Sequence, residues 1–467
     1  MTPPINKPTI QIFLYDLQEG LGQDNEAINQ NRLKFWQRIN KDITIKDIEN
    51  YQAYEKPEST NLVSLGGETR KSFENNLLDG WYAPFQFGDN YILVISNCGD
   101  EKKENSLEKI KQQITNKFDI EKPTLGKTWL ILRQLPANFS IEEIAKDCYT
   151  KIQPNYSEND KVKTAKPNQL LGGYLVEYWR PPQNWLSLDK ETARKQTEIL
   201  KEKAQLHTLE NHHYLIWLFP NDIPTKDITD INQYLIRLLC HRHKIIWAYY
   251  QSRQLKDNLK QSYTQIEKII ATFIADKNKP QKMQQNLTTT LDILATFAVR
   301  LNQLFLQKRT VEINLESYKE QLQKLIKELP EGSPQPHLEN FQQFSKLAKE
   351  KYLRQIESDY TSLSPGMTLL ENLIKTIEGF NQIEQTRTEQ NLTLTIGITG
   401  AALAASGVTA TLISTQIPNP QPHTKEGISL TSAFFGSFSL VILFAFVIGG
   451  ILAWRRPSTP KKPKNRS

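Results

Sequence analysis

The chain is poor in cysteine and lacks the short motifs that mark common enzyme sites. Its 467 residues include three cysteines, Cys98, Cys148 and Cys240, which are too scattered for a disulfide framework and are typical of reduced thiols in a cytosolic compartment. The motifs H-E-x-x-H, G-x-S-x-G, C-x-x-C, G-x-x-x-x-G-K-S/T and G-x-G-x-x-G are absent. Since no residue is marked as a nucleophile, a general base or a nucleotide ligand, we predict that the protein is not an enzyme.

The chain also lacks an even spread of basic charge. Its net charge is +7, but residues 391–467 hold seven Lys or Arg and one Glu, which is +6 of that total. The rest is close to neutral, so the charge gives no support for nucleic-acid binding. The first seven residues, M-T-P-P-I-N-K, have no apolar h-region, and we expect no signal peptide.

Two long apolar runs near the C-terminus are the most informative feature. Residues 392–413 and 430–454 form uncharged runs of 22 and 25 residues, separated by a polar loop of 16 residues. At 1.5 Å per residue a helix of this length spans about 30 Å, the thickness of a bilayer's hydrocarbon core. The sequence therefore predicts a transmembrane hairpin over 391–454, with the lipid bilayer as a partner.

The charge around the hairpin predicts its orientation. The tail, 455–467, begins with Arg455 and Arg456 and carries four more basic residues, whereas Lys425 and Glu426 cancel in the loop between the runs. Basic flanks stay cytoplasmic, and two spans return the chain to the side on which it began. We therefore expect an integral membrane protein with both termini in the cytoplasm. Trp454 fits an interfacial anchor.

The first part of the chain, 1–223, predicts a cytoplasmic α/β or α+β domain. Short β-branched or aromatic runs, mostly bounded by Gly, Pro, Asn or Asp, are typical of strands. They occupy residues 9–15, 91–96, 128–133, 173–178 and 213–219. Helices are expected near 103–117, 140–151 and 188–206, the second opening with a capping box at Ser140 and Glu143.

Residues 224–390 predict a helical, coiled-coil-like stalk. Apolar residues follow one helical face from 228, break at Asn278-Lys-Pro280, and then recur in steps of four and three up to Leu329. The run Pro330–Pro336 ends that helix, and a shorter helix is expected over about 338–360. After a break at 364–366, a last helix is expected to start near Met367 and to enter the membrane unbroken.

The two apolar runs differ in composition. The first is rich in Gly, Ala, Ser and Thr, and the second in Phe, Leu, Val and Ile. Small residues let helices approach closely, so we expect the first span to face protein or a pore and the second to face lipid. Hydroxyl groups on one face of the first span are the pore-lining candidates: Thr395, Thr399, Ser406 and Thr409. The neighbouring face holds candidates for helix packing: Gly397, Gly400, Ala404 and Gly407.

This stripe has a second interpretation, and the pattern does not separate the two. The hydroxyls can bond back to their own i−4 carbonyls while the small residues only pack the hairpin. One hairpin cannot enclose a pore, so a channel requires a homo-oligomer.

The order of these parts resembles the CorA-type divalent-cation channels. Residues 387–396, R-T-E-Q-N-L-T-L-T-I, are similar to that family's entry into its first span, and Arg455-Arg456 is similar to its basic ending. The resemblance implies a homopentamer, a divalent cation as the ion, and a first span that lines the pore. The family's Gly-Met-Asn signature is absent. Residues 414–420 read S-T-Q-I-P-N-P, in which Asn419 is the candidate for the outer mouth.

A membrane-anchored scaffold or sensor is the alternative function. The missing signature favours it, as does the single acid, Glu426, of the outer loop.

One cluster invites a metal-binding interpretation. Cys240, His241 and His243 lie close in sequence, but on a helix only Cys240 and His243 share a face, and two ligands do not complete a zinc site. We expect an ordinary helix surface there and identify no cofactor. His212 and His213 are expected in a loop.

Overall fold

The computed structural model describes one compact unit, which lies within Met1–Gly407. The described residues are 8–20, 23–56, 59, 61–66, 70–75, 78–99, 106–153, 163–164, 166–180, 212–220, 225–276, 280–334 and 336–384. Within these ranges no helix has both the length and the apolar character of a membrane span. The runs 392–413 and 430–454, with every site residue proposed on them, lie outside the described residues.

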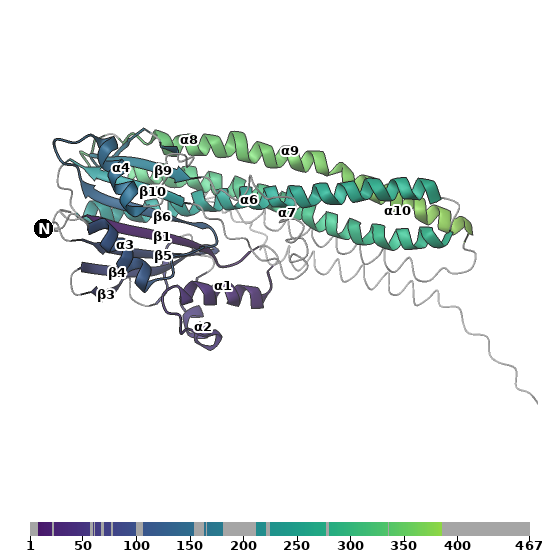
Figure 1. Cartoon of the computed structure of the whole chain (residues 1–467), viewed down its shortest axis with the longest axis horizontal. Helices are drawn as coiled ribbons and strands as arrows, with labels where there is room; N and C mark the ends of the chain where they lie inside the picture. Colours follow the sequence, from purple (N-terminus) through teal and green to yellow (C-terminus); the bar gives the residue numbers. More distant parts are fainter. Residues whose placement is uncertain are drawn as a thin grey trace, which may run out of the picture. The chain divides into compact units, whose positions relative to one another are not determined.

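A mixed sheet forms the first part of this unit (Figure 1). Its strands follow the order β2-β4-β5-β1-β6-β10-β9-β7, with β3 paired to β4 and β8 paired to β9. Neighbouring strands are antiparallel except for β6 and β10, which are parallel. The strands are β1 (Thr9–Leu17), β2 (Val63–Ser64), β3 (Lys71–Asn75), β4 (Leu78–Phe87), β5 (Asn90–Cys98), β6 (Gly126–Gln134), β7 (Lys163–Thr164), β8 (Asn168–Leu170), β9 (Gly173–Arg180) and β10 (His212–Phe219).

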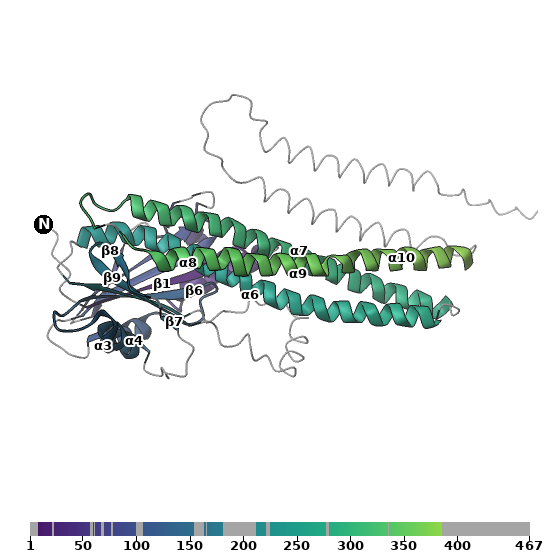
Figure 2. The same cartoon turned by 90° about the horizontal axis from the view of Figure 1, so that it is seen from above.

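Both faces of the sheet are buried. Successive residues of a strand point to opposite faces, so the central strands carry apolar side chains on both. In β1, Ile10, Ile12 and Leu14 join one core, whereas Phe13 and Tyr15 join the other. The first core is covered by helices α1 (Asn25–Gln37), α2 (Ile45–Gln52), α3 (Ser106–Lys117) and α4 (Ile141–Ile152). The second core continues without a break into the long helices, which therefore stand on the opposite face (Figure 2).

Three long helical segments form a stalk. The first two are α6 (Thr225–Asp276) and α7 (Pro280–Lys327). The third is made of α8 (Glu339–Leu347), a π-helical turn η2 (Ala348–Leu353), α9 (Arg354–Leu363) and α10 (Pro365–Glu384). The inner face of α7 is the heptad stripe expected from the sequence, with its buried members at Leu294, Ala298, Leu301, Val311, Leu315, Tyr318, Leu322 and Leu325.

Side-chain contacts fix the direction of the third segment. The rings of Tyr249 and Tyr352 stack with their centroids 4.2 Å apart, and Arg253 pairs with Asp359 at 2.5 Å, so the segment runs parallel to α6. It runs antiparallel to α7, because Lys308 pairs with Glu357 at 2.9 Å and Tyr318 packs on Phe344. The same register brings the end of α10 level with the connection between α6 and α7, far from the sheet (Figure 2).

The expected mixed α/β domain followed by long helices is confirmed. The five predicted strands occur as β1, β5, β6, β9 and β10. The predicted helices at 103–117 and 140–151 occur as α3 and α4, and Ser140 forms the expected capping box with Glu143. The predicted helix at 188–206 lies outside the described residues.

Two predicted boundaries in the third segment need correction. The break expected at 364–366 is only one residue long, because Pro365 already begins α10. Proline suits the first position of a helix, because a backbone N–H at that position would have no intrahelical acceptor. The helix expected over 338–360 extends to Leu363 and contains η2.

A buried ion pair ties the first helix to the sheet. Arg38, just after α1, donates from Nε to Asp16 Oδ2 at 2.6 Å and from Nη2 to Oδ1 at 3.1 Å. The same guanidinium donates to the carbonyls of Asp119, Glu121 and Lys122, and Thr124 donates its N–H to Asp16. Burial alone would raise the pKa of Asp16, but Arg38 and Thr124 outweigh it and lower that pKa.

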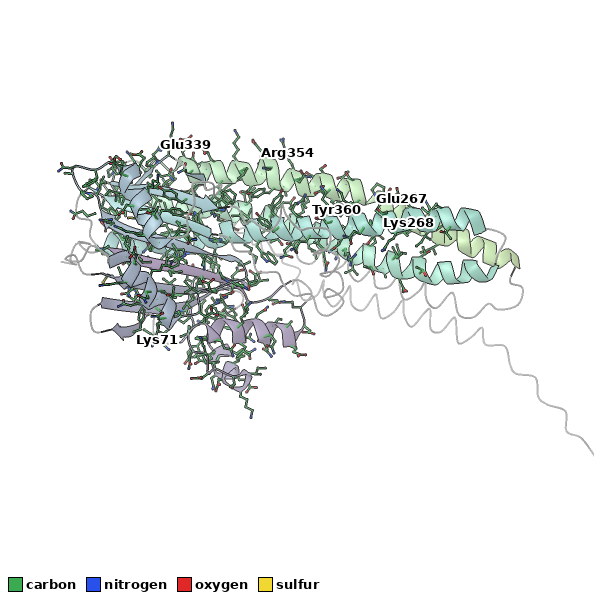
Figure 3. The ribbon with its side chains drawn as sticks, in the orientation of Figure 1. Lys71, Glu267, Lys268, Glu339, Arg354 and Tyr360 are labelled. Carbon is green, nitrogen blue, oxygen red and sulfur yellow. The ribbon has the colours of Figure 1, made fainter. Side chains whose placement is uncertain are left out.

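We predict that Arg38→Met lowers the free energy of unfolding by about 3–5 kcal/mol, because it leaves the Asp16 carboxylate buried without its cation. Urea unfolding of the full-length chain, followed by tryptophan fluorescence, measures this. Arg354→Met is the matched control, since Arg354 is exposed on α9 (Figure 3). Equal losses in the two variants would show that the ion pair contributes nothing specific.

Candidate functional site

A buried polar network joins the sheet to the stalk. Three neighbouring strands each supply one residue on the face that meets the stalk: Thr128 on β6, His213 on β10 and Glu177 on β9. His213 and Thr128 are direct partners in the parallel β6–β10 ladder. Helix α6 supplies His243 and Arg242 from the opposite side. These five residues come from four elements, so only the folded topology brings them together.

The network is one continuous chain of contacts. His243 Nε2 lies 2.8 Å from Thr128 Oγ1, and the same hydroxyl lies 2.9 Å from His213 Nδ1. His213 Nε2 lies 3.1 Å from Glu177 Oε1, which also accepts from Arg242 Nη2 at 3.0 Å. Thr128, His213 and His243 are fully buried.

These distances fix where the protons lie. A carboxylate only accepts, so His213 must carry its proton on Nε2 and leave Nδ1 as an acceptor. Thr128 then donates its only hydroxyl proton to His213, and its oxygen accepts from His243 Nε2–H. Each group in this series of hydrogen bonds thus has one role, and all donors point toward Glu177. The two histidine tautomers are fixed in this way.

Burial keeps both imidazoles neutral. It lowers the pKa of His213 from 6.5 to about 4, with a further lowering from Arg242 that Glu177 partly offsets. Burial also lowers the pKa of His243. For Glu177 burial acts in the opposite direction, but His213 and Arg242 outweigh it and bring the pKa to about 2. At neutral pH the network therefore holds one anion, Glu177, and one cation, Arg242.

Arg242 is the cation of the network and is almost fully enclosed. Its guanidinium lies 5.0 Å from the ring centroid of Phe344 on α8 and 5.7 Å from that of Trp179 on β9. Aromatic faces attract a desolvated cation, so these rings partly replace water. Arg242 therefore joins a strand, α6 and the third stalk segment at one point.

Arg242 and His243 belong to a single turn of α6 whose four polar residues reach four different elements. His241 Nδ1 lies 2.9 Å from Asn314 Oδ1 on α7. Lys244 forms an ion pair with Asp89 in the turn between β4 and β5. We call His241, Arg242, His243 and Lys244 the polar turn. It fixes α6 to the sheet and to both other stalk segments.

The polar turn corrects two expectations. The ordinary helix surface expected for Cys240, His241 and His243 is wrong, because Cys240 and His243 are fully buried. The loop expected for His212 and His213 is also wrong, since both lie in β10. Burial raises the pKa of the Cys240 thiol to about 12, which leaves it protonated. The described residues include no group of three or more His, Cys, Asp or Glu placed to hold a metal ion.

The contacts of Thr128, His213 and Glu177 have the order of a nucleophile, a base and an acid. An acyl-transfer site needs a nucleophile that substrate can reach. Thr128 and His213 are completely buried, so this triad is closed to substrate. The three residues can instead hold β6, β10 and β9 together, and binding of a proton would change their contacts.

A cavity of about 610 Å³ lies beside α1 and α2, at one end of the polar turn. Its lining includes Asp89, which also pairs with Lys244, and Glu55, which binds Arg32 through both oxygens at 2.6 and 2.8 Å. Glu19 adds a third acid, and four amides complete most of the polar wall: Gln18, Asn25, Asn29 and Gln52. The cavity is therefore polar and carries more negative than positive charge.

The pore-lining candidates Thr395, Thr399, Ser406 and Thr409, the packing candidates Gly397, Gly400, Ala404 and Gly407, and Asn419 all lie outside the described residues. Reasoning from sequence missed the polar turn, although a signal was present. Buried apolar residues flank it on both sides along the helix, from Leu235 to Cys240 with Arg237 as the one exception, and from Ile245 to Tyr250. A helix that is apolar all round is buried, so polar residues inside it need partners.

No protein-family model and no curated protein matches this chain.

We predict that unfolding near pH 5 takes up about three protons. His213 and His241 have pKa values of about 4 when folded, and that of His243 is also lowered, whereas unfolded histidines titrate near 6.5. A lowered histidine pKa gives stability that is complete above pH 6.5 and is lost as the pH falls toward 4. The free energy of unfolding should then fall by about 4 kcal/mol per pH unit near pH 5.

Urea unfolding at a series of pH values measures this slope. His241→Asn should reduce the uptake to about two protons, whereas Thr264→Asn, at an exposed position on α6, should leave it unchanged. A slope that does not depend on His241 would contradict the burial of a neutral imidazole there.

We predict that Thr128→Val lowers the free energy of unfolding by about 2–4 kcal/mol, because it leaves a buried donor on His243 and a buried acceptor on His213 without partners. Valine has nearly the shape of threonine, so packing changes little. Thr264→Val, at an exposed position on α6, is the matched control. Unfolding by urea at pH 7 compares the two, and a loss at Thr128 no larger than at Thr264 would argue against the network.

Proposed function

We propose that this chain is an oligomeric integral membrane protein with CorA-like architecture, in which the sheet and stalk gate an ion path through a C-terminal hairpin. The supporting observation is the number and direction of the stalk segments. The chain leaves the sheet along α6, returns along α7 and leaves again along the third segment. Because the chain runs along the stalk three times, the last described residues lie at the end of the stalk farthest from the sheet.

The position of this exit gives the proposal its geometry. Seven residues, 385–391, separate the last described residue, Glu384, from Leu392, the start of the first apolar run. A hairpin starting there would place the membrane at the far end of the stalk and the sheet in the cytoplasm. Movement of the third segment would then act directly on the first span.

The proposed ion path follows the hydroxyl stripe of the first span. Thr395, Thr399, Ser406 and Thr409 would line it, Asn419 would lie near its outer mouth, and Gly397, Gly400, Ala404 and Gly407 would pack the helices. A divalent cation is the proposed ion, by resemblance to the CorA-type family. Several copies of the chain are required, because two spans cannot surround a pore.

We predict that Thr399→Leu combined with Ser406→Leu reduces divalent-cation flux into liposomes at least tenfold, because the two changes replace polar groups of the path with apolar ones. A fluorescent indicator for the cation inside the liposomes measures the flux. Ser437→Leu, which removes a hydroxyl from the second span, is the matched control.

Two results would count against the channel. Flux that is unchanged in the Thr399 and Ser406 variant would remove the proposed path. A monomeric mass of the detergent-solubilised chain, measured by light scattering, would leave too few spans to enclose a pore.

A membrane-anchored sensor without transport is the second candidate, and the 610 Å³ cavity favours it. Asp89 lines this cavity and holds Lys244 of α6, so a ligand that competes for Asp89 would release one contact between sheet and stalk. A monomeric chain whose melting temperature rises with a cationic ligand would support this reading over the channel.

A further inference from the structure

The cavity beside α1 and α2 has the size of a site for a small organic molecule. Its volume of about 610 Å³ lies within the usual range of about 300–1,000 Å³ for such sites and greatly exceeds the space that one metal ion needs. Its lining comes from the end of β1, one face of α1, the end of α2 and the turn between β4 and β5. The charges and amides of this lining decide which class of molecule fits.

Arg32 supplies a positive charge to the wall of the cavity, but this charge is already paired. Its side chain is 4% exposed and donates from Nε and Nη2 to the two oxygens of Glu55 at 2.6 and 2.8 Å, and from Nη1 to Asn29 Oδ1 at 2.5 Å. Glu55 also accepts from Gln18 Nε2 at 2.8 Å and from the hydroxyl of Tyr91. An anionic ligand therefore finds no unpaired cation here, which argues against phosphates and carboxylic acids.

Two carboxylates at the rim of the cavity have less compensation. Glu19 is exposed and forms no ion pair within the described residues, and the side chain of Asp89 is 51% exposed. The two lie on neighbouring strand ends, because Gln18 donates its N–H to the carbonyl of Asp89 at 2.9 Å. Lys244 is the ion-pair partner of Asp89, and its own side chain is 9% exposed. The rim therefore holds two negative charges against one positive charge, and a second cation is attracted there.

The rest of the lining is polar and aliphatic. No aromatic ring is among the described residues that line the cavity, and Ile28 supplies its apolar side chain. Nucleobases and aromatic cations would have no ring to stack on. The side-chain amides of Asn25 and Gln52 take part in no hydrogen bond within the described residues, so their oxygens can accept N–H groups from a ligand. An aliphatic cation with several N–H groups satisfies all of these conditions.

We propose that this cavity binds an aliphatic diamine or polyamine. One ammonium group of the ligand lies between Glu19 and Asp89, and its other N–H groups bond to the side-chain amides of Asn25 and Gln52. The inference names the ligand of the second candidate function, the sensor, and rests on that function only for what binding does to the stalk.

The ligand and Lys244 compete for the same carboxylate. Lys244 belongs to the polar turn of α6, so its pair with Asp89 is one of the contacts between sheet and stalk. An ammonium group of the ligand on the exposed side of Asp89 takes part of that negative charge and repels Lys244. By linkage, each of the two cations weakens the binding of the other. Occupation of the cavity therefore loosens the contact that Asp89 makes with α6.

Isothermal titration calorimetry of the full-length protein in mild detergent, with spermidine as the probe, tests the site. Salt at about 150 mM screens charges more than about 8 Å apart, so attraction by the whole surface contributes little. We expect one spermidine per chain. Glu19→Gln should weaken the binding about three- to fivefold, because it removes one exposed ion pair with the ligand. Glu267→Gln is the matched control and should leave the affinity unchanged, since Glu267 is exposed farther along α6 (Figure 3).

Lys244→Met tests the site in the opposite direction. It removes the competing cation, so spermidine should bind about three- to fivefold more tightly. Lys268→Met is its matched control, because Lys268 is also exposed farther along α6 and the same charge is lost (Figure 3). General attraction to a more acidic protein would change both lysine variants equally.

Three outcomes would overturn the proposal: no binding of spermidine to the wild-type protein, equal affinities of the wild type and Glu19→Gln, or equal affinities of the wild type and Lys244→Met. Magnesium chloride is titrated separately. Binding of Mg²⁺ that Glu19→Gln abolishes, without binding of spermidine, would make the cavity a metal site instead.

The flux assay separates this inference from the channel, because calorimetry needs no transport. Spermidine binding without any flux keeps the cavity site and removes the channel, whereas flux without spermidine binding keeps the channel and removes the site.

Discussion

The enclosure of α6 is the constraint on which the rest of this structure depends. Between Leu238 and Tyr250 it lies between the sheet on one side and two other helical segments on the other, and every residue there except the half-buried His241 is buried. A polar group in such a place must find its partner inside the protein. The polar turn meets this condition by giving each of its four residues a different partner element.

Because of these contacts, the sheet and the stalk are expected to move together as one rigid unit. The apolar core runs continuously from the strands into the stalk, and the polar turn fixes the relative position of the two by directional contacts. Apolar packing tolerates small shifts, whereas a chain of hydrogen bonds with fixed proton positions does not. A displacement of the strands near Thr128 or Glu177 would therefore be transmitted to α6. Asp89 extends the unit to the wall of the cavity beside α1 and α2.

The sequence predicted the local features of this fold and missed those that depend on long-range pairing. The strand containing Thr128 and the helical period of α6 are visible in residue order, because β-branched runs and apolar spacing act locally. The contact of Thr128 with both His213 and His243 joins residues 85 and 115 positions apart, and no local pattern encodes it. Helical spacing shows which residues share a face but not what covers that face, so it does not reveal that Cys240 and His243 are buried.

The π-helical turn η2 has a consequence for the phase of the third segment. The buried residues Phe344 and Leu363 are 19 positions apart, so an unbroken α-helix would rotate the second about 100° away from the first. A π-turn holds about one residue more than an α-turn and removes about that angle. The single extra residue thus restores the phase, so that the buried residues of α8 and those of α9–α10 face the same groove between α6 and α7.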